Sequence, residues 1–178
     1  MANSRQSNGR YPSGNGTPSR RVSMREGASH ALLDDVAKQI IEQLQEDGRR
    51  PYATIGKAVG LSEAAVRQRV QRLLDSGVMQ IVAVTDPTEL GFGREAMIGI
   101  CCSGDSIRVA ERLTLIDEIV YVVLTAGRFD IVIEVVCEDD EHLLDLLNTH
   151  IRSLPGVHLA ETLVYLKTLK QQYNWGTR

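Results

Sequence analysis

The stretch LSEAAVRQRVQRLLDSG, Leu61 to Gly77, decides how the first half of this chain folds. Its apolar residues recur at spacings of three and four, which predicts a helix with one buried stripe. That stripe consists of Val66, Val70, Leu73 and Leu74. Ser62 is a favoured N-cap residue, and glycine is favoured just past a helix end. The opposite side of this amphipathic helix is polar and basic, and it faces either water or a partner.

Two shorter helices are expected before this stretch. Apolar residues at helical spacing predict a helix over residues 33–46, which Pro51 prevents from continuing. YATIGKAV (52–59) fits a second helix, and Gly60 can adopt the left-handed backbone conformation of a tight turn after it. Three helices with a glycine turn between the second and the third predict a helix-turn-helix domain.

In such a domain the exposed, N-terminal side of the third helix enters the major groove of DNA. The residues expected to contact DNA are Ser62, Glu63, Ala64, Arg67, Gln68, Arg69, Gln71 and Arg72. Arg67 and Gln68 have the geometry for bidentate contacts to guanine or adenine, whereas Arg69 and Arg72 are better placed for phosphates. A solvated helix face is the alternative, and for one isolated helix it would be preferred. The two preceding helices and the glycine turn favour DNA binding.

The second half of the chain has a different pattern, in which apolar strands alternate with amphipathic helices. The expected strands span 95–103, 118–126, 130–138 and 157–173, and the expected helices span 106–117 and 139–154. Ile107 and Ala110, with Leu113 or Leu115, are expected to face inward. The order β-α-β-β-α-β is the ferredoxin-like arrangement. The predicted fold class is α+β, with an N-terminal winged-type helix-turn-helix domain and a C-terminal βαββαβ ferredoxin-like domain.

The connection VMQIVAVTDPTELGFGR (78–94) is expected to begin as a short strand and to end in turns, with the domain boundary at Asp86-Pro87. The N-terminus is rich in Ser, Gly, Asn, Pro and Arg, which is typical of a disordered segment. The predicted divisions are a disordered basic tail (1–30), the helix-turn-helix domain (31–85), a linker (86–94), the ferredoxin-like effector and dimerisation domain (95–173) and a C-terminal tail (174–178).

The predicted sheet implies a partner subunit. Both of its helices would cover one face, so the other face should be wet and polar. The strands expected at 118–126 and 130–138 are instead apolar at nearly every position. The chain has no third helix left to cover the second face, and a partner sheet from another subunit is the simplest cover. We expect an obligate homodimer, which would also present two helix-turn-helix units to two half-sites.

Charge is unevenly spread along the chain. The formal net charge is −3, and it runs from +4 over residues 1–30 through 0 over 31–85 to −7 over 86–178. The two halves are therefore expected to meet different partners. Three cysteines without a CxxC pair indicate a reducing, intracellular compartment. No apolar run is long enough for a membrane helix, and we expect a cytoplasmic, nucleoid-associated protein without a membrane partner.

A basic helix-turn-helix followed by a small βαββαβ domain resembles the Lrp/AsnC family, the feast/famine regulators of bacteria and archaea. The resemblance covers about residues 31–173. Two motifs carry it: LSxxxVxxRVxRLxxxG at 61–77, and TxGxxD, formed by Thr125, Gly127 and Asp130. It implies a sequence-specific, DNA-binding transcriptional regulator that assembles as dimers or as larger rings such as octamers. It also implies that an amino acid or a related small metabolite modulates DNA binding or assembly.

By this resemblance, the loop after the second strand lies near the effector cleft. The candidate effector contacts are Thr125, Gly127, Arg128, Phe129 and Asp130. Gly127 would allow close backbone approach, and exposed N–H groups or a carboxylate would meet the charged ends of an amino acid. The alternative, which does not exclude effector contact, is a plain hairpin turn capped by Asp130. Arg128 is a bulky cation in this loop that could alter or exclude the usual ligand.

Two other functions are weighed against DNA-binding regulation. Sirohaem decarboxylases have a similar two-part build, but no nucleophile–base pair or metal-ligand spacing stands out in this chain. Its histidines form no evident cluster in the sequence: His30, His142, His150 and His158. We therefore expect no enzymatic activity, no cofactor and no metal site. A nucleoid architectural protein that binds DNA broadly is the other alternative.

Overall fold

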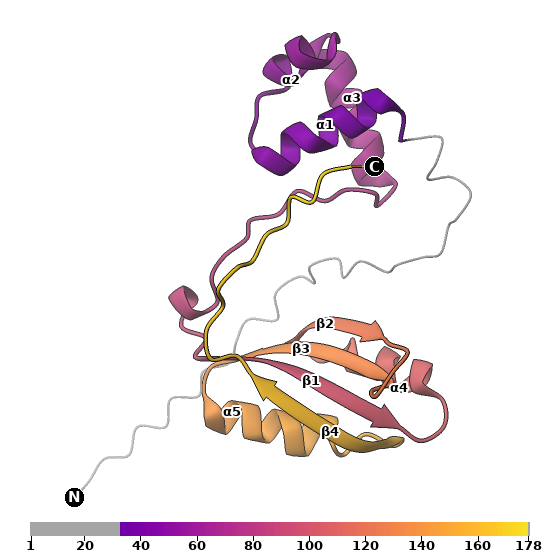
Figure 1. Ribbon diagram of the computed structural model, residues 1–178, viewed down its shortest axis with the longest axis vertical. Helices are drawn as coiled ribbons and strands as arrows, with labels where there is room; N and C mark the ends of the chain where they lie inside the picture. Colours follow the sequence, from indigo (N-terminus) through magenta and orange to yellow (C-terminus); the bar gives the residue numbers. More distant parts are fainter. Residues whose placement is uncertain (1–32, 178) are drawn as a thin grey trace, which may run out of the picture. The chain divides into compact units, whose positions relative to one another are not determined.

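A computed structural model of the chain describes residues 33–177 and divides them into two compact units. Within these residues the first unit comprises 33–82 and 172–177, and the second comprises 83–171 (Figure 1). The basic tail expected over residues 1–30 lies outside the described residues. No helix in the described part of the chain has both the length and the apolar character to cross a membrane.

Three helices form the core of the first unit: α1 (Asp35–Glu46), α2 (Tyr52–Val59) and α3 (Glu63–Asp75). They confirm the predicted helix-turn-helix. Asp34 caps α1 by accepting a hydrogen bond from the Ala37 amide at 2.7 Å. Ser62 caps α3 in the same way, accepting from the Ala65 amide at 3.3 Å. The side chains at the centre of this unit are fully buried: Ile40, Ile55, Val66, Val70 and Leu73.

The turn between α2 and α3 depends on two glycines. Gly60 ends α2 with a φ of 73°, in the left-handed region that the sequence predicts for it. Gly56 is buried on α2, and a Cβ at this position would stand 2.5 Å from the carbonyl oxygen of Leu61. The backbone therefore comes too close at Gly56 to admit a side chain without moving.

The wing strand expected after α3 is not formed. Between α3 and the first strand of the sheet, the structure has only the short 3-10 helix η2 (Thr88–Leu90). The extended residues 79–86 lie beside no strand with which they share ladder hydrogen bonds, and a strand needs such a neighbour. Three apolar side chains of this segment are exposed: Ile81, Val82 and Val84.

The second unit is a four-stranded antiparallel sheet with helices on one face. Its strands are β1 (Arg94–Cys102), β2 (Ile119–Leu124), β3 (Ile131–Cys137) and β4 (Val157–Val164), in the order β2-β3-β1-β4. Its helices are α4 (Ser106–Leu113) and α5 (Asp140–Asp145), the latter continued by the π-helical turn η3 (Leu146–Ile151). Each half contributes one β-α-β segment, and the strand order confirms the predicted ferredoxin-like arrangement.

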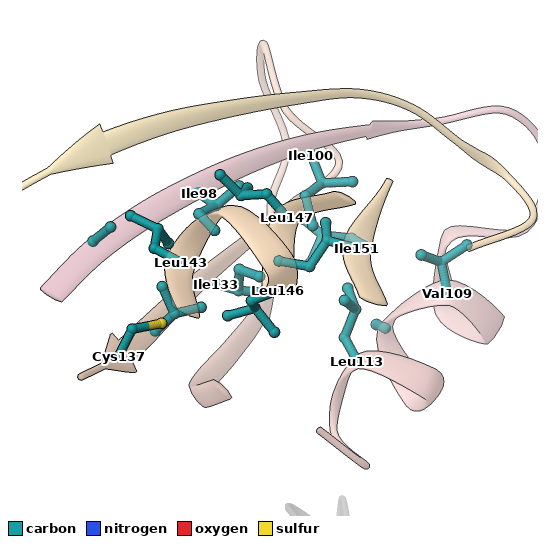
Figure 2. Packing of buried hydrophobic residues seen from close by; sticks show 14 residues of the cluster. Ile98, Ile100, Val109, Leu113, Ile133, Cys137, Leu143, Leu146, Leu147 and Ile151 are labelled. Atoms are coloured by element: carbon teal, nitrogen blue, oxygen red, sulfur yellow. The ribbon is translucent and has the colours of Figure 1, made fainter. Parts of the chain in front are cut away.

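The core of this unit lies between the sheet and its helices. Ile98, Ile100 and Ile133 point from the strands toward Leu146 and Ile151 (Figure 2). β3 shows the alternation most clearly, because every second residue from Ile131 to Cys137 is buried. The helices therefore cover one face of the sheet and leave the other to be covered by something else.

Two predicted elements are shorter than expected. The helix predicted over 106–117 ends at Leu113, and Ile107, expected inward, is 57% exposed because the packed face of α4 carries Val109, Ala110 and Leu113. The strand predicted over 157–173 ends at Val164. Beyond Tyr165, whose amide bonds the Glu95 carbonyl, β4 reaches the start of β1 and has no neighbour left to pair with.

Candidate functional site: a nucleic-acid interface and a ligand loop

The side of α3 opposite its buried stripe is open and polar. The exposed residues among the predicted DNA contacts are Ser62, Glu63, Ala64, Arg67, Gln68, Gln71 and Arg72. Arg69 is the exception, because it is only partly exposed and lies beside the buried stripe. The structure thus gathers seven of the eight predicted residues on one accessible surface, here called the α3 surface.

Most polar side chains on the α3 surface have partners that DNA could replace. Arg67 pairs with Glu63 at 2.8 Å and lies over the ring of Tyr52, 5.3 Å from its centroid. Gln71 donates a hydrogen bond to Asp75 at 2.8 Å. These contacts are exposed and weak, so phosphates or base edges can displace them at small cost.

Arg69 has a different kind of partner. Its Nη1 atom donates to both carboxylate oxygens of Asp34, at 2.9 and 2.8 Å. Asp34 is also the N-cap of α1, so one carboxylate serves two helices. The amide of Ala37, followed by the guanidinium of Arg69, lowers the pKa of Asp34. The phosphate contact expected of Arg69 would have to compete with this ion pair.

The predicted effector loop, residues 125–130, is held by bonds within the chain. The Thr125 hydroxyl donates to the Phe129 carbonyl at 2.6 Å, and the Thr125 amide donates to the Asp130 carbonyl at 2.9 Å. The Asp130 carboxylate accepts a hydrogen bond from the Cys102 amide at 2.7 Å, where the pairing of β1 with β4 becomes irregular. Asp130 thus tethers the loop to the end of β1, a partner that turn chemistry did not predict.

The middle of the loop folds back over the sheet face that has no helices. The ring of Phe129 lies against Gly99 of β1, where a Cβ would stand 2.5 Å from ring carbons. Arg128 lies over the same ring, 5.2 Å from its centroid, and pairs with Glu161 of β4 at 2.6 Å. Arg128 of the loop and Glu161 of β4 therefore place a cation and an anion side by side at the surface.

The space around Gly127 is open within the chain. A Cβ built on it meets nothing within 4 Å, and its φ is not positive. Within this single chain, the fold places no demand for glycine at this position.

The face of the sheet without helices is largely apolar but carries acids. Its exposed apolar side chains are Met97, Tyr121, Leu159 and Leu163. Glu134 lies on this face and accepts a hydrogen bond from the Tyr165 hydroxyl at 2.8 Å. Burial, followed by the nearby charges of Glu134 and Asp86, raises the pKa of Glu95. This is the face that the sequence analysis expected a partner subunit to cover.

Sequence reasoning missed three residues that organise these surfaces. The sequence pattern singled out none of these three: Asp34, Gly99 and Glu161. The register of the β1–β4 pairing places Gly99 and Glu161 opposite each other, but nothing in the sequence indicates that a distant loop folds over them. Among residues 33–177, no group of three or more His, Cys, Asp or Glu residues is placed to hold a metal ion.

Two protein-family models match the chain. Residues 33–74 match the AsnC-type helix-turn-helix domain, and residues 106–178 match a C-terminal dimeric alpha+beta barrel domain. The HTH-type transcriptional regulator FL11 of Pyrococcus horikoshii is 37% identical over 141 residues, which cover 78% of this chain and 93% of that protein.

Solved structures agree with these matches. The leucine response regulatory protein LrpA of Mycobacterium tuberculosis superposes with a TM-score of 0.71 at 30% identity, covering 78% of this chain and 96% of that one. AsnC of Escherichia coli superposes with a TM-score of 0.70 at 25% identity, covering 79% of this chain and 97% of that one.

Proposed function

Because this chain belongs to the Lrp/AsnC family of helix-turn-helix transcriptional regulators, we propose that it binds specific DNA sequences through the α3 surface and that a small metabolite modulates this binding. The observation that carries the proposal is the α3 surface itself. A capped, basic helix exposes its polar side, while its apolar stripe is buried against α1 and α2. That is the geometry in which a recognition helix enters the major groove.

Specific roles follow from the positions on α3. Gln68 and Arg67 are proposed to contact base edges, where amide and guanidinium groups make bidentate hydrogen bonds. Arg72 is proposed to contact a phosphate. Ser62 and Glu63 lie at the N-terminal end of α3, where free backbone N–H groups favour an anion. Ala64 and Gln71 complete the surface.

The dimer is proposed to form through the sheet face without helices. This face exposes apolar side chains on β1, β2 and β4, and a second copy offers the same face. The match to a dimeric domain supports this choice of occupant. We also propose that dimers assemble into larger rings such as octamers. As a DNA-binding regulator, the protein is proposed to act on the nucleoid in the cytoplasm.

The effector is proposed to be an amino acid bound at the 125–130 loop. Arg128 and Glu161 offer opposite charges at the surface, matching the carboxylate and ammonium ends of an amino acid. The similar Mycobacterium tuberculosis protein carries a leucine response in its name, which supports this class of ligand. Thr125, Gly127, Phe129 and Asp130 are proposed to shape the site around this charge pair.

Genomic DNA pull-down by the full chain, with and without a panel of amino acids, tests the proposal. We expect enriched fragments, and a changed enrichment with one or a few amino acids. Arg72→Gln should weaken binding to all sequences and reduce the salt slope by about 1. Gln68→Ala should instead reduce discrimination at one base pair by about 1–3 kcal/mol. Arg108→Gln, an exposed change on α4, is the control. If neither Arg72→Gln nor Gln68→Ala altered DNA binding, the α3 surface would not be the DNA-binding surface.

A further inference from the structure

We propose that Arg69 is a positioning residue, not a phosphate ligand: its ion pair with Asp34 fixes α3 against the N-terminus of α1 and so sets how the α3 surface meets DNA. The inference rests on the proposed DNA-binding function. It departs from the expectation that an arginine in a recognition helix contacts phosphate.

The position of Arg69 on α3 is the first argument. It follows Val66 by three residues and precedes Leu73 by four, so it lies on the same side of the helix as these buried residues. The residues proposed to read DNA lie on the opposite side. Accordingly Arg69 is partly covered, with 29% of its side chain exposed, whereas 65% of the Arg67 side chain is exposed.

The geometry of the ion pair is the second argument. The remaining contacts between α1 and α3 are apolar, such as the cluster of Ala37, Ile41 and Leu73. Apolar contacts have no preferred direction, and they allow one helix to rotate or slide on another. The charged hydrogen bonds from Arg69 Nη1 to the two oxygens of Asp34 are directional. Asp34 is itself held by the Ala37 amide, so the pair ties α3 to a fixed point on α1.

Charge balance is the third argument. Asp34 neutralises Arg69, so the pair presents little net charge to a phosphate. Arg72 is close enough to lower the pKa of Asp34 further, but it makes no ion pair with that carboxylate in the structure. The positive charge available to a phosphate at this end of the surface is therefore that of Arg72.

Asp34→Asn separates the two roles of Arg69, because one role predicts stronger DNA binding by the variant and the other predicts weaker binding. Asparagine is an equally good N-cap, so α1 keeps its cap while the ion pair is lost. If Arg69 were a phosphate ligand, its release would strengthen DNA binding and steepen the salt slope by about 1. If it positions α3, Asp34→Asn should weaken binding by about two- to fivefold, the range expected for the loss of one partly exposed ion pair.

Asp35→Asn is the matched control. It removes the same negative charge at the neighbouring position, in the first turn of α1 and outside the α3 surface, and it leaves the Arg69–Asp34 pair in place. We expect it to leave binding unchanged or to strengthen it slightly. Binding of the full chain is measured by fluorescence anisotropy, on a random-sequence duplex and on the fragment most enriched in the genomic pull-down. Circular dichroism melts confirm that each variant is folded at the temperature of the assay.

Arg69→Gln completes a double-mutant cycle. A positioning pair predicts that the double variant binds no more weakly than either single variant, because each change breaks the same contact. The double variant has the net charge of the wild type, so its salt slope should equal that of the wild type. This comparison decides the question even if Asp34→Asn alone fails to fold.

The outcomes are distinct. Affinity of Asp34→Asn below that of Asp35→Asn, with non-additive single changes, supports the inference. Affinity of Asp34→Asn at or above that of Asp35→Asn, or a salt slope of the double variant lower by about 1, overturns it. A wild-type chain that enriches no fragment and does not bind the random duplex would instead remove the proposed function.

Discussion

The ring of Phe129 lies directly against the backbone of Gly99, which leaves no room for a side chain on β1 at that point. These two residues are thirty positions apart in the sequence, and they join the predicted effector loop to the sheet face without helices. The absence of a side chain at 99 is thus what allows the loop to fold back.

Gly99→Ala should destabilise the C-terminal unit by about 1–3 kcal/mol, because its Cβ would overlap ring carbons of Phe129. The loss is measured by urea denaturation followed by circular dichroism. Adding Phe129→Ala removes the overlap and should recover part of the loss. Gly127→Ala is the control, because it lies in open space and should be nearly neutral. Equal stability of Gly99→Ala and Gly127→Ala would show that the ring does not lie on Gly99.

Gly56→Ala should destabilise the helix-turn-helix unit, although alanine is the better helix former by about 1 kcal/mol. The new Cβ would stand 2.5 Å from the Leu61 carbonyl oxygen, which is backbone and cannot rotate away. We expect a net loss of about 1–3 kcal/mol in urea denaturation. Ala58→Gly, at an exposed position of α2, measures how much the difference in helix propensity between alanine and glycine contributes to stability. A stabilising effect of Gly56→Ala would contradict the close approach.

Leu163→Glu should weaken dimerisation if the sheet face without helices is the interface. Leu163 is 50% exposed in the single chain and neighbours Met97 on that face. A carboxylate buried there without a partner should raise the dimer dissociation constant by at least about tenfold. Sedimentation equilibrium of the full chain measures this. Leu115→Glu, at an 81% exposed site after α4, should have no effect.

Glu95 should make the protein more stable as the pH falls, which is the opposite of the usual effect of a carboxyl group. Its pKa is raised above the ordinary 4.5, first by burial and then by Glu134. The folded state therefore binds this proton more tightly than the unfolded state, so stability rises as the pH falls from neutrality toward 4.5. Asp34 and Asp140, whose pKa values are lowered, act in the opposite sense and lose their contribution as the pH falls below 3.8.

Glu95→Gln isolates this effect. The variant should be more stable than the wild type at neutral pH, and the difference should shrink as the pH approaches 4.5. Thermal melts across this range measure it, with the exposed Glu111→Gln as the control. A difference that stays constant with pH would show that Glu95 does not titrate in this way.

The sequence alone determined the elements that depend on local pattern and capping. The spacing of Val66, Val70 and Leu73, the Ser62 cap and the glycine at 60 predicted α3 and its turn, and the structure confirms them. The order of apolar strands and amphipathic helices predicted the ferredoxin-like sheet, which the strand order confirms. These signals are local because hydrogen bonds within a helix and side-chain alternation along a strand repeat over only a few residues.

Only the tertiary structure decided where elements stop and which distant side chains meet. β4 ends at Val164 because β1 offers no further neighbour, and residues 79–86 form no strand because none pairs with them. The partners of Arg69 and Asp130 lie 35 and 28 residues away in the sequence. Such pairs depend on how whole helices and strands pack, and no local period records that packing. The residue types on α3 could therefore be recognised from the sequence, but the ion pair that partly covers Arg69 could not.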